Sequence, residues 1–284
     1  MTLDETERRY VEELLSAMRG PCEAQFPDAS PLISEEFAKE FRATLLIHHY
    51  FLKAPLAMTS FEAAFVRAAR AAGHTVNPAP DGQRFWDVEV DGKRISLKST
   101  AAANLRVGLL HIPKLCEAAW IQDMRSAALR EEATKRLFAE YTGAVDSIIQ
   151  LRLFKNRAFY ELVEIPTDIL AQVDDVPHAE FAPDGPTIGI PVGKNPPDFT
   201  LKLDRSDAKV TLANINKNVC TVLGTWQLQA EQFPNIPNSL SVRFGRFCRP
   251  CGPFSITFSA SRALAASTLR VAGGVGRGRG RSTG

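Results

Sequence analysis

Asp87 and Lys98 have the side-chain chemistry needed to hydrolyse a phosphodiester bond. In that reaction a divalent cation neutralises the scissile phosphate and activates water, and a nearby ammonium group stabilises charge in the transition state. A carboxylate can hold the cation, and a lysine supplies the ammonium group. The residue types therefore predict that Asp87 binds a metal and that Lys98 serves the attacking water.

A tight β-hairpin is the element that must bring these two side chains together. Asp91-Gly92 tolerates the positive φ angles of a two-residue type I′ turn, and apolar and polar residues alternate on both sides of it. In this register Asp87 faces Ser96. The expected apolar face consists of Trp86, Val88, Val90, Ile95 and Leu97. The expected polar face consists of Asp87, Glu89, Arg94, Ser96 and Lys98.

Glu62 is the expected second carboxylate. One carboxylate holds Mg²⁺ poorly, since Mg²⁺ prefers one or two carboxylates together with phosphate and water. Glu62 lies in a predicted helix with Ser60 as its N-cap and Gly73 at its C-terminal end. We expect Asp87 and Glu62 to hold Mg²⁺ together.

Each of these residues also has a purely structural interpretation. Glu62 in a first helical turn can simply complement the helix dipole. Asp87 and Lys98 can belong to a solvated polar sheet face, since the bare spacing occurs widely by chance. Glu89 opposite Arg94 favours a cross-strand ion pair. The sequence around the hairpin provides the evidence that distinguishes these interpretations.

The hairpin resembles the PD-(D/E)-x-K nuclease superfamily, in which an aspartate precedes an acid-x-lysine sequence on the adjoining strand. Ser96 departs from this pattern, because it occupies the position of the acid. Within that superfamily, residues 35–226 resemble the SmaI-like family of type II restriction endonucleases. The segments that carry the resemblance are Leu46-Ile-His-His49, Ser60-Phe-Glu-Ala-Ala-Phe65, Thr100-Ala-Ala-Ala-Asn104, His111-Ile-Pro-Lys114, Leu151-Arg-Leu-Phe-Lys155, Leu162-Val-Glu-Ile-Pro166 and Gly224-Thr-Trp226.

This resemblance implies a mixed α/β fold of the restriction-endonuclease type, with a central mixed sheet flanked by helices. It implies a Mg²⁺-dependent homodimer that cuts both strands of double-stranded DNA, because a two-fold symmetric pair reads a palindrome twice. The implied target is a GC-rich palindrome such as CCCGGG, and a cognate DNA methyltransferase is the implied functional partner. Glu62 falls on a matching glutamate of the family, and the family's second hairpin acid is also absent.

Other functions stay open at this point. Thr100 departs from an acidic position of the family, so Ser96 and Thr100 allow a non-cutting DNA-binding relative. A repair or junction-resolving nuclease of the same superfamily would prefer mismatched or branched DNA. A plain protein-interaction domain with a polar sheet face would have no affinity for DNA. The chain contains no phosphate-binding glycine loop, which argues against an ATP-driven nuclease.

Composition and charge divide the chain into a body and a tail. At 45% hydrophobic and 23% charged, the 284 residues fit one globular domain with a sizeable core, expected over residues 1–226. From residue 227 to the end, eight arginines, no lysine and one acid give +7, so the first 226 residues carry −5. The Arg-, Gly- and Ser-rich tail over 227–284 predicts either a disordered basic arm or non-native sequence from a shifted reading frame.

An acidic body needs a local basic lining to bind DNA. The candidates for this lining are Lys93, Arg94, Arg106, His111 and Lys114. The N-terminus is charged, there is no run of 18 apolar residues, and five scattered cysteines suit a reducing compartment. We therefore expect a cytoplasmic protein without a membrane partner.

Periodicity predicts the remaining elements. Helices are expected over residues 3–19, 34–53 and 123–142, and strands near 148–155 and 158–165. Residues 173–198 are rich in Pro, Asp and Gly and predict a long loop.

Overall fold

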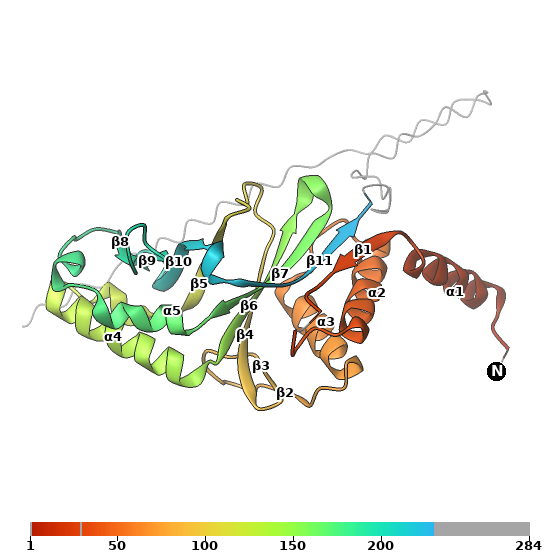
Figure 1. The fold of residues 1–284 in the computed structure, drawn as a ribbon, viewed down its shortest axis with the longest axis horizontal. Coiled ribbons are helices and arrows are strands. Elements are labelled where there is room, and N and C mark those ends of the chain that lie inside the picture. The colour runs from red at the N-terminus through yellow and green to blue at the C-terminus, as the bar shows by residue number, and fades with distance from the viewer. Residues whose placement is uncertain (1, 29, 230–284) are drawn as a thin grey trace, which may run out of the picture. The chain divides into compact units, whose positions relative to one another are not determined.

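A seven-stranded mixed sheet lies at the centre of this computed structural model, which describes residues 2–28 and 30–229 (Figure 1). Its strand order is β1-β11-β7-β6-β4-β3-β2, with β4 and β6 parallel and the other neighbours antiparallel. The strands are β1 Cys22–Gln25, β2 Val76–Pro78, β3 Val88–Val90, β4 Lys93–Thr100, β6 Ser147–Phe154, β7 Phe159–Pro166 and β11 Thr221–Leu228. A mixed sheet flanked by helices confirms the predicted fold class.

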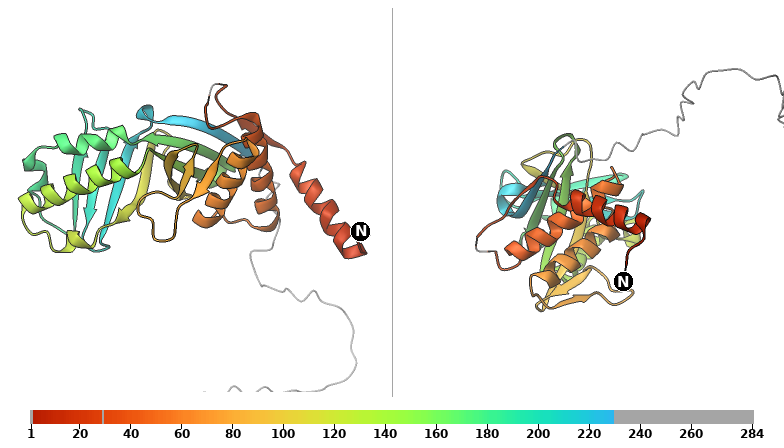
Figure 2. Two further views of the ribbon diagram at one scale, coloured as in Figure 1. Left: turned by 90° about the horizontal axis from the view of Figure 1, so that it is seen from below. Right: turned by 90° about the vertical axis from the view of Figure 1, so that its right-hand side faces the viewer.

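Two helices, α2 Glu35–Phe51 and α3 Met58–Ala71, cover one face of this sheet (Figures 1 and 2). Large apolar side chains recur in them at helical spacing and turn one stripe of each helix inward. The fully buried aromatic residues of this core are Phe37, Phe41, Phe61, Phe65, Tyr160 and Trp226. These rings fix α3 against β4, the strand that carries Lys98.

The start of α3 differs from the prediction. The helix begins at Met58, and Ala57 occupies the N-cap position without a side-chain hydrogen bond, so the predicted Ser60 cap is wrong. Apolar packing of the first turn extends the helix past the residue whose side chain could cap it. Gly73 follows the helix with a φ of +90°, which confirms the predicted C-terminal end.

A second sheet, which the sequence pattern did not predict, lies beside the other face of the central sheet. Its order is β5-β10-β9-β8, all antiparallel. The strands are β5 Leu109–Glu117, β8 Thr187–Val192, β9 Phe199–Asp204 and β10 Lys209–Asn216. β8 falls within residues 173–198, so the predicted long loop there is wrong over that strand.

Helices α4 Ala127–Ala144 and α5 Asp168–Ala171 pack with this second sheet in a separate core (Figure 2). Ser126 caps α4, since its side chain accepts a hydrogen bond from the Leu129 N–H. Short 3-10 turns complete the fold: η1 Ala119–Gln122, η2 Lys155–Arg157, η3 Gln172–Asp175, η4 His178–Phe181 and η5 Lys217–Val219.

The β3–β4 hairpin has the predicted turn and register. Asp91 and Gly92 have φ angles of +49° and +83°, and Val88 pairs with Ile95. Trp86, however, packs in the second core rather than beside Val88, which corrects its predicted face. The reason is Phe85, whose φ of +77° turns the chain just before β3 begins.

The predicted ion pair between Glu89 and Arg94 is wrong. The two residues face each other, but the Arg94 guanidinium donates to Asp146, with Nε 3.2 Å from Oδ2. Glu89 instead accepts a hydrogen bond from the Asn77 side-chain amide at 3.2 Å. Arg94 binds Asp146 in preference to Glu89 because the Asp146 carboxylate accepts hydrogen bonds from both the backbone N–H and the guanidinium of Arg94.

The N-terminal helix α1, Glu5–Met18, precedes the sheet and confirms the helix predicted there. Asp4 and Glu7 form a reciprocal capping box at its start. None of the helices within the described ranges is both long and apolar enough to cross a membrane. At the other end β11 continues to Leu228, two residues past the predicted domain boundary, and the rest of the predicted tail, 230–284, lies outside the described residues.

Candidate functional site

Asp87 is held in a fixed orientation at the entrance to β3. Its backbone N–H donates to the Ile95 carbonyl at 2.9 Å. Its Oδ2 accepts the Leu97 N–H at 2.6 Å and the Ser96 hydroxyl at 3.4 Å. No hydrogen bond from any described residue reaches Oδ1. One oxygen of Asp87 is thus used to position the side chain, and the other is left for a ligand.

Lys98 lies beside this carboxylate. Its Nζ is 3.8 Å from Asp87 Oδ2, and the two side chains are 20% and 32% exposed. Burial lowers the pKa of Lys98, while the charges of Asp87 and Glu62 oppose that shift. The ammonium group therefore sits in a partly desolvated place, where its effect on a developing negative charge is stronger than in water.

Glu62 reaches the same place from α3. The first turn of that helix lies at the C-terminal end of β4, where the Ser99 hydroxyl is 3.6 Å from Met58 Sδ. Burial, and then the charge of Asp87, raise the pKa of Glu62, while Lys98 lowers it. No described residue donates a hydrogen bond to its carboxylate. The structure therefore brings Asp87, Glu62 and Lys98 together, as the sequence predicted.

These residues suit a hard divalent cation. Two carboxylates that repel each other, one with an oxygen left over, match the one or two protein carboxylates that Mg²⁺ takes alongside phosphate and water. Within the described ranges no group of three His, Cys, Asp or Glu side chains could hold a metal, so the site offers two ligands rather than a full cage. Ser96 is fully buried and donates to Asp87, so it does not act as the missing acid.

A polar cavity of about 480 Å³ opens onto Asp87 and Lys98. Arg84 from the preceding turn and Lys114 from β5 also line it, and Lys114 donates to Glu117 at 2.5 Å. Cys116 lies in the same wall, and burial raises the pKa of its thiol to about 11, so the thiol stays protonated at neutral pH. The cavity can accept a phosphate group between the basic side chains and the carboxylate.

The other predicted basic residues are spread over the domain. Lys114 lines the cavity, whereas Lys93 and Arg94 lie at the turn end of β4, roughly 15 Å from Lys98 at about 3.3 Å per residue. His111 lies on β5, and partial desolvation of its ring, followed by the charges of neighbouring lysine and arginine side chains, lowers its pKa. Arg106 lies in the loop between β4 and β5 and donates to Asn214.

A buried ionic cluster that the sequence analysis missed anchors the β4–β5 loop. Arg152 is fully buried and donates to Glu161 at 2.6 Å. It also donates to the carbonyl oxygens of Arg106 at 2.5 Å and Leu109 at 3.1 Å, while Lys217 pairs with Glu161. An arginine within the apolar strand Ser147–Phe154 was the available signal, since a buried charge requires partners.

Removing this anchor should destabilise the fold. Arg152→Ala leaves Glu161 buried with only Lys217 and deprives the loop carbonyls of their donor, so we expect a loss of about 3–5 kcal/mol in the free energy of unfolding. Urea denaturation followed by circular dichroism measures it. The matched control is Arg94→Ala, whose ion pair with Asp146 is exposed and should cost at most about 1 kcal/mol. Equal losses in the two variants would contradict an anchoring role.

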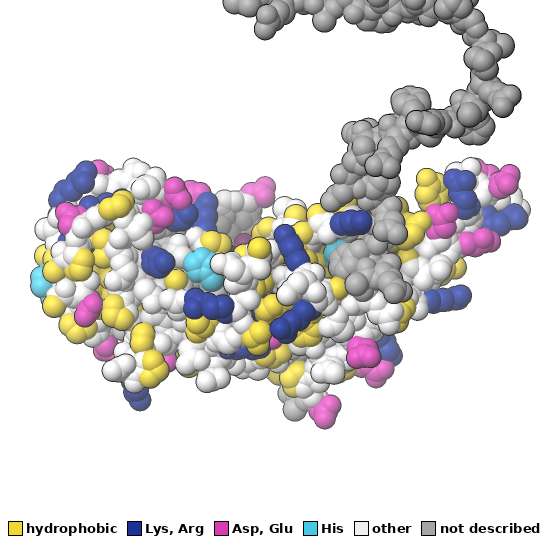
Figure 3. Space-filling model, turned by 90° about the horizontal axis from the view of Figure 1, so that it is seen from above, with side chains coloured by type: hydrophobic (Ala, Val, Ile, Leu, Met, Phe, Trp, Pro, Cys, Tyr) yellow, Lys and Arg dark blue, Asp and Glu magenta, His cyan; other side chains and the backbone are white. Residues whose placement is uncertain are grey.

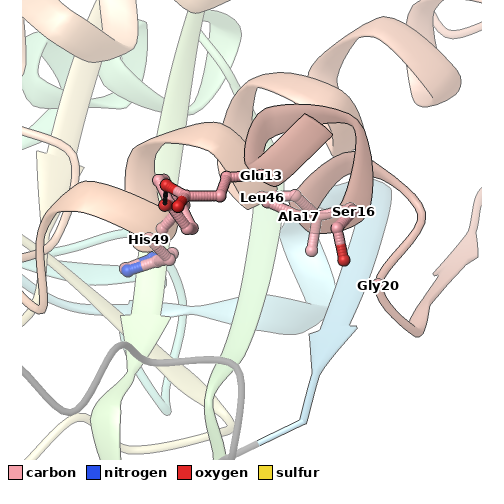
Figure 4. A pocket seen from close by; sticks show the side chains of 7 residues that line it. Glu13, Ser16, Ala17, Gly20, Leu46 and His49 are labelled. Atoms are coloured by element: carbon pink, nitrogen blue, oxygen red, sulfur yellow. Dashed lines mark hydrogen bonds between the residues drawn. The ribbon is translucent and has the colours of Figure 1, made fainter. Parts of the chain in front are cut away.

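A second cavity, of about 270 Å³, lies between α1 and α2 (Figure 4). His49 forms part of its wall, and its Nε2 lies 2.7 Å from the Tyr160 hydroxyl. Burial lowers the pKa of His49 to about 4, so the ring is neutral at neutral pH. Glu13 accepts a hydrogen bond from Tyr50 across this cavity at 2.5 Å. These contacts give His49 a structural role, and none of the predicted site residues lines the cavity.

Known proteins resemble the chain over most of the described domain. The SmaI family of type II site-specific deoxyribonucleases matches residues 13–228. The type II restriction enzyme SmaI of Serratia marcescens is 26% identical over 206 residues, which cover 69% of this chain and 81% of that protein. A solved structure described as a restriction endonuclease in complex with substrate DNA matches 78% of this chain and 83% of its own, at 13% identity and a TM-score of 0.29.

Proposed function

Because the chain belongs to the SmaI family of type II site-specific deoxyribonucleases, we propose that it cuts both strands of duplex DNA at a short palindrome, with Mg²⁺ as its cofactor. The observation that carries this proposal is the pair of Asp87 and Lys98 in the wall of one polar cavity, with the Glu62 carboxylate near enough to interact electrostatically with both. Two carboxylates and an ammonium group in one place are what metal-assisted hydrolysis of a phosphodiester needs.

The chain's own residues have separate roles in this proposal. Asp87 and Glu62 hold the cation, which would neutralise the scissile phosphate and lower the pKa of the attacking water. The Leu97 N–H and the Ser96 hydroxyl hold the Asp87 carboxylate in one orientation through Oδ2, so that Oδ1 is available to the cation without a change of rotamer. Lys98 orients the water and stabilises the charge that develops on the phosphate. Arg84 and Lys114 attract the phosphate into the cavity.

The finer features of the proposal rest on family membership. We propose a homodimer that reads a GC-rich palindrome such as CCCGGG, because a two-fold symmetric pair places one cutting site on each strand. A cognate methyltransferase would protect the host's own copies of that site. We propose the cytoplasm as the place of action, since incoming DNA and the chromosome that the methyltransferase protects meet there.

A second candidate function follows from one observation. Ser96 and Thr100 supply no acid, so the site has two carboxylates where the superfamily pattern offers more. A site that holds the cation too weakly would leave a relative that binds DNA without cutting it. This candidate predicts the same affinity for duplex DNA and no metal-dependent cleavage.

Digestion of a sequenced plasmid separates the two candidates. We expect the purified full chain to release discrete fragments with Mg²⁺ and none with EDTA, since two carboxylates alone cannot activate water. Sequencing of the fragment ends then gives the target and the position of the cut. Intact plasmid in every condition, together with retained DNA binding, would favour the non-cutting relative. Cleavage only of branched or mismatched duplexes would indicate a repair nuclease.

A further inference from the structure

Three loops meet at the end of the central sheet where β4 and β6 finish. β4 and β6 are parallel, so their C-terminal ends lie at the same edge, just beyond Lys98. The loops span residues 101–108, 155–158 and 217–219. They contain four basic residues and no acidic residue, although the first 226 residues together carry −5. Figure 3 looks onto the end where the β6–β7 hairpin stands uppermost in Figure 1, and Lys and Arg side chains spread across the middle of this face.

Backbone contacts hold these loops in place. The Lys217 N–H donates to the Gly108 carbonyl at 3.0 Å, and the Gln227 side-chain amide donates to the Arg157 carbonyl at 2.6 Å. The anchor Arg152 fixes the loop that contains Arg106 from beneath. Loops that are already ordered lose little conformational entropy when a ligand binds. The geometry is therefore that of a preformed surface.

The positive charges on this surface differ in their partners. Lys217 is neutralised by the buried Glu161, and Arg106 donates to the neutral side chain of Asn214. Lys155 and Arg157 are exposed, and neither side chain makes a hydrogen bond or ion pair to any described residue. Three full positive charges, those of Arg106, Lys155 and Arg157, therefore face solvent together without an acid. We name these three residues the basic rim.

The distance from the basic rim to the catalytic site suits a DNA backbone. Lys98 is level with Gln150 in the parallel pair, so Lys155 lies five residues further along β6 and the turn that follows it. At about 3.3 Å per residue this is roughly 17 Å, which a duplex covers in about five base pairs. A phosphate in the Lys98 cavity would thus leave neighbouring phosphates within reach of the basic rim.

We propose that the basic rim binds the phosphate backbone of duplex DNA beside the scissile position. This contact would fix the position of the DNA strand so that the scissile phosphate lies in the cavity of Asp87 and Lys98. The inference rests on the proposed function, since it takes DNA as the ligand. Phosphate contacts position a protein on the duplex without reading its sequence. Removal of the basic rim should therefore weaken binding to all duplexes alike and leave the target sequence unchanged.

The test is a pair of double variants with equal change in charge. Lys155→Ala/Arg157→Ala removes two charges from the basic rim, and Arg125→Ala/Lys194→Ala removes two exposed charges from the segments before α4 and after β8. Fluorescence anisotropy with labelled duplexes that contain or lack the mapped target, over a range of salt concentrations, gives the affinity and its salt slope. We expect the basic rim variant to bind about tenfold to a hundredfold more weakly, with a slope reduced by about two.

The outcomes distinguish this inference from the proposed function. If the wild-type chain cuts plasmid DNA and the basic rim variant binds as tightly as the charge-matched control, with an unchanged salt slope, the inference is overturned and the proposed function stands. If the wild-type chain binds through the basic rim and cuts nothing, only the proposed cleavage fails. If the wild-type chain has no affinity for any duplex, both are wrong. Melting temperatures equal to wild type would show that Lys155→Ala/Arg157→Ala acts on binding and not on folding.

Discussion

Lys98→Ala is expected to lower the rate of DNA cleavage by about 10²- to 10³-fold, while duplex binding stays within a few-fold of wild type. The ammonium group lies 3.8 Å from Asp87 and is only partly exposed, and no other basic side chain in the described part of the chain forms an ion pair with that carboxylate. A group that stabilises the transition state more than the bound substrate affects kcat and not affinity. The measurement is single-turnover cleavage of a duplex that carries the mapped target.

Two further variants make the result interpretable. Lys98→Met keeps the apolar stem without the charge, so a loss equal to that of Lys98→Ala assigns the effect to the ammonium group and not to packing. Lys39→Ala removes a lysine that is 68% exposed and paired with Glu35 on α2, and it should leave cleavage unchanged. Wild-type rates in both Lys98 variants would return the residue to the interpretation of a polar sheet face.

Much of this site could be predicted from local sequence because local chemistry dictates it. The Asp91-Gly92 dipeptide sets the turn, the turn sets the register, and the register places Asp87 and Lys98 on one face of the hairpin. Glu62 required a further step, since it comes from a helix and reaches the site only because Phe61 and Phe65 pack that helix on the sheet.

The parts that could not be predicted depend on contacts between distant segments. β10 pairs with β5 across roughly a hundred residues, and no short pattern encodes such a pairing, so the second sheet was missed. Trp86 was placed on the wrong face because a positive φ at Phe85, a residue type that rarely adopts one, reverses the chain. The Arg94 ion pair was missed because its partner is distant in the sequence. Arg94 binds Asp146, which follows the end of α4, and not Glu89 on the neighbouring strand.

Asp87→Asn and Glu62→Gln should both raise the Mg²⁺ concentration needed for cleavage, and Asp87→Asn should have the larger effect. The side-chain amide that Asp87→Asn introduces keeps an oxygen that can accept the Leu97 N–H, so the fold should survive while the charge is lost. Charge stabilisation by a bound metal contributes several kcal/mol, so a fall in the maximal rate of about 10³-fold is expected. Cleavage rates measured over a titration of Mg²⁺ separate the loss of affinity from the loss of rate.

The comparison between the two acids tests the second ligand. Helix α3 begins at Met58 and has no acid in its first turn, so the predicted alternative of Glu62 as a first-turn acid that complements the helix dipole is wrong. As a ligand, its loss should shift the Mg²⁺ dependence, and the matched helix variant Glu132→Gln, an exposed acid of α4, should not. As a residue with only a structural role, its loss should change only the melting temperature, by an amount that corresponds to less than about 1 kcal/mol. Burial and the charge of Asp87 already raise the pKa of Glu62, so its carboxylate is destabilised by its neighbour in the absence of a cation. A Mg²⁺ dependence identical to wild type would leave Asp87 as the single acid of the site and would strengthen the case for a relative that binds DNA without cutting it.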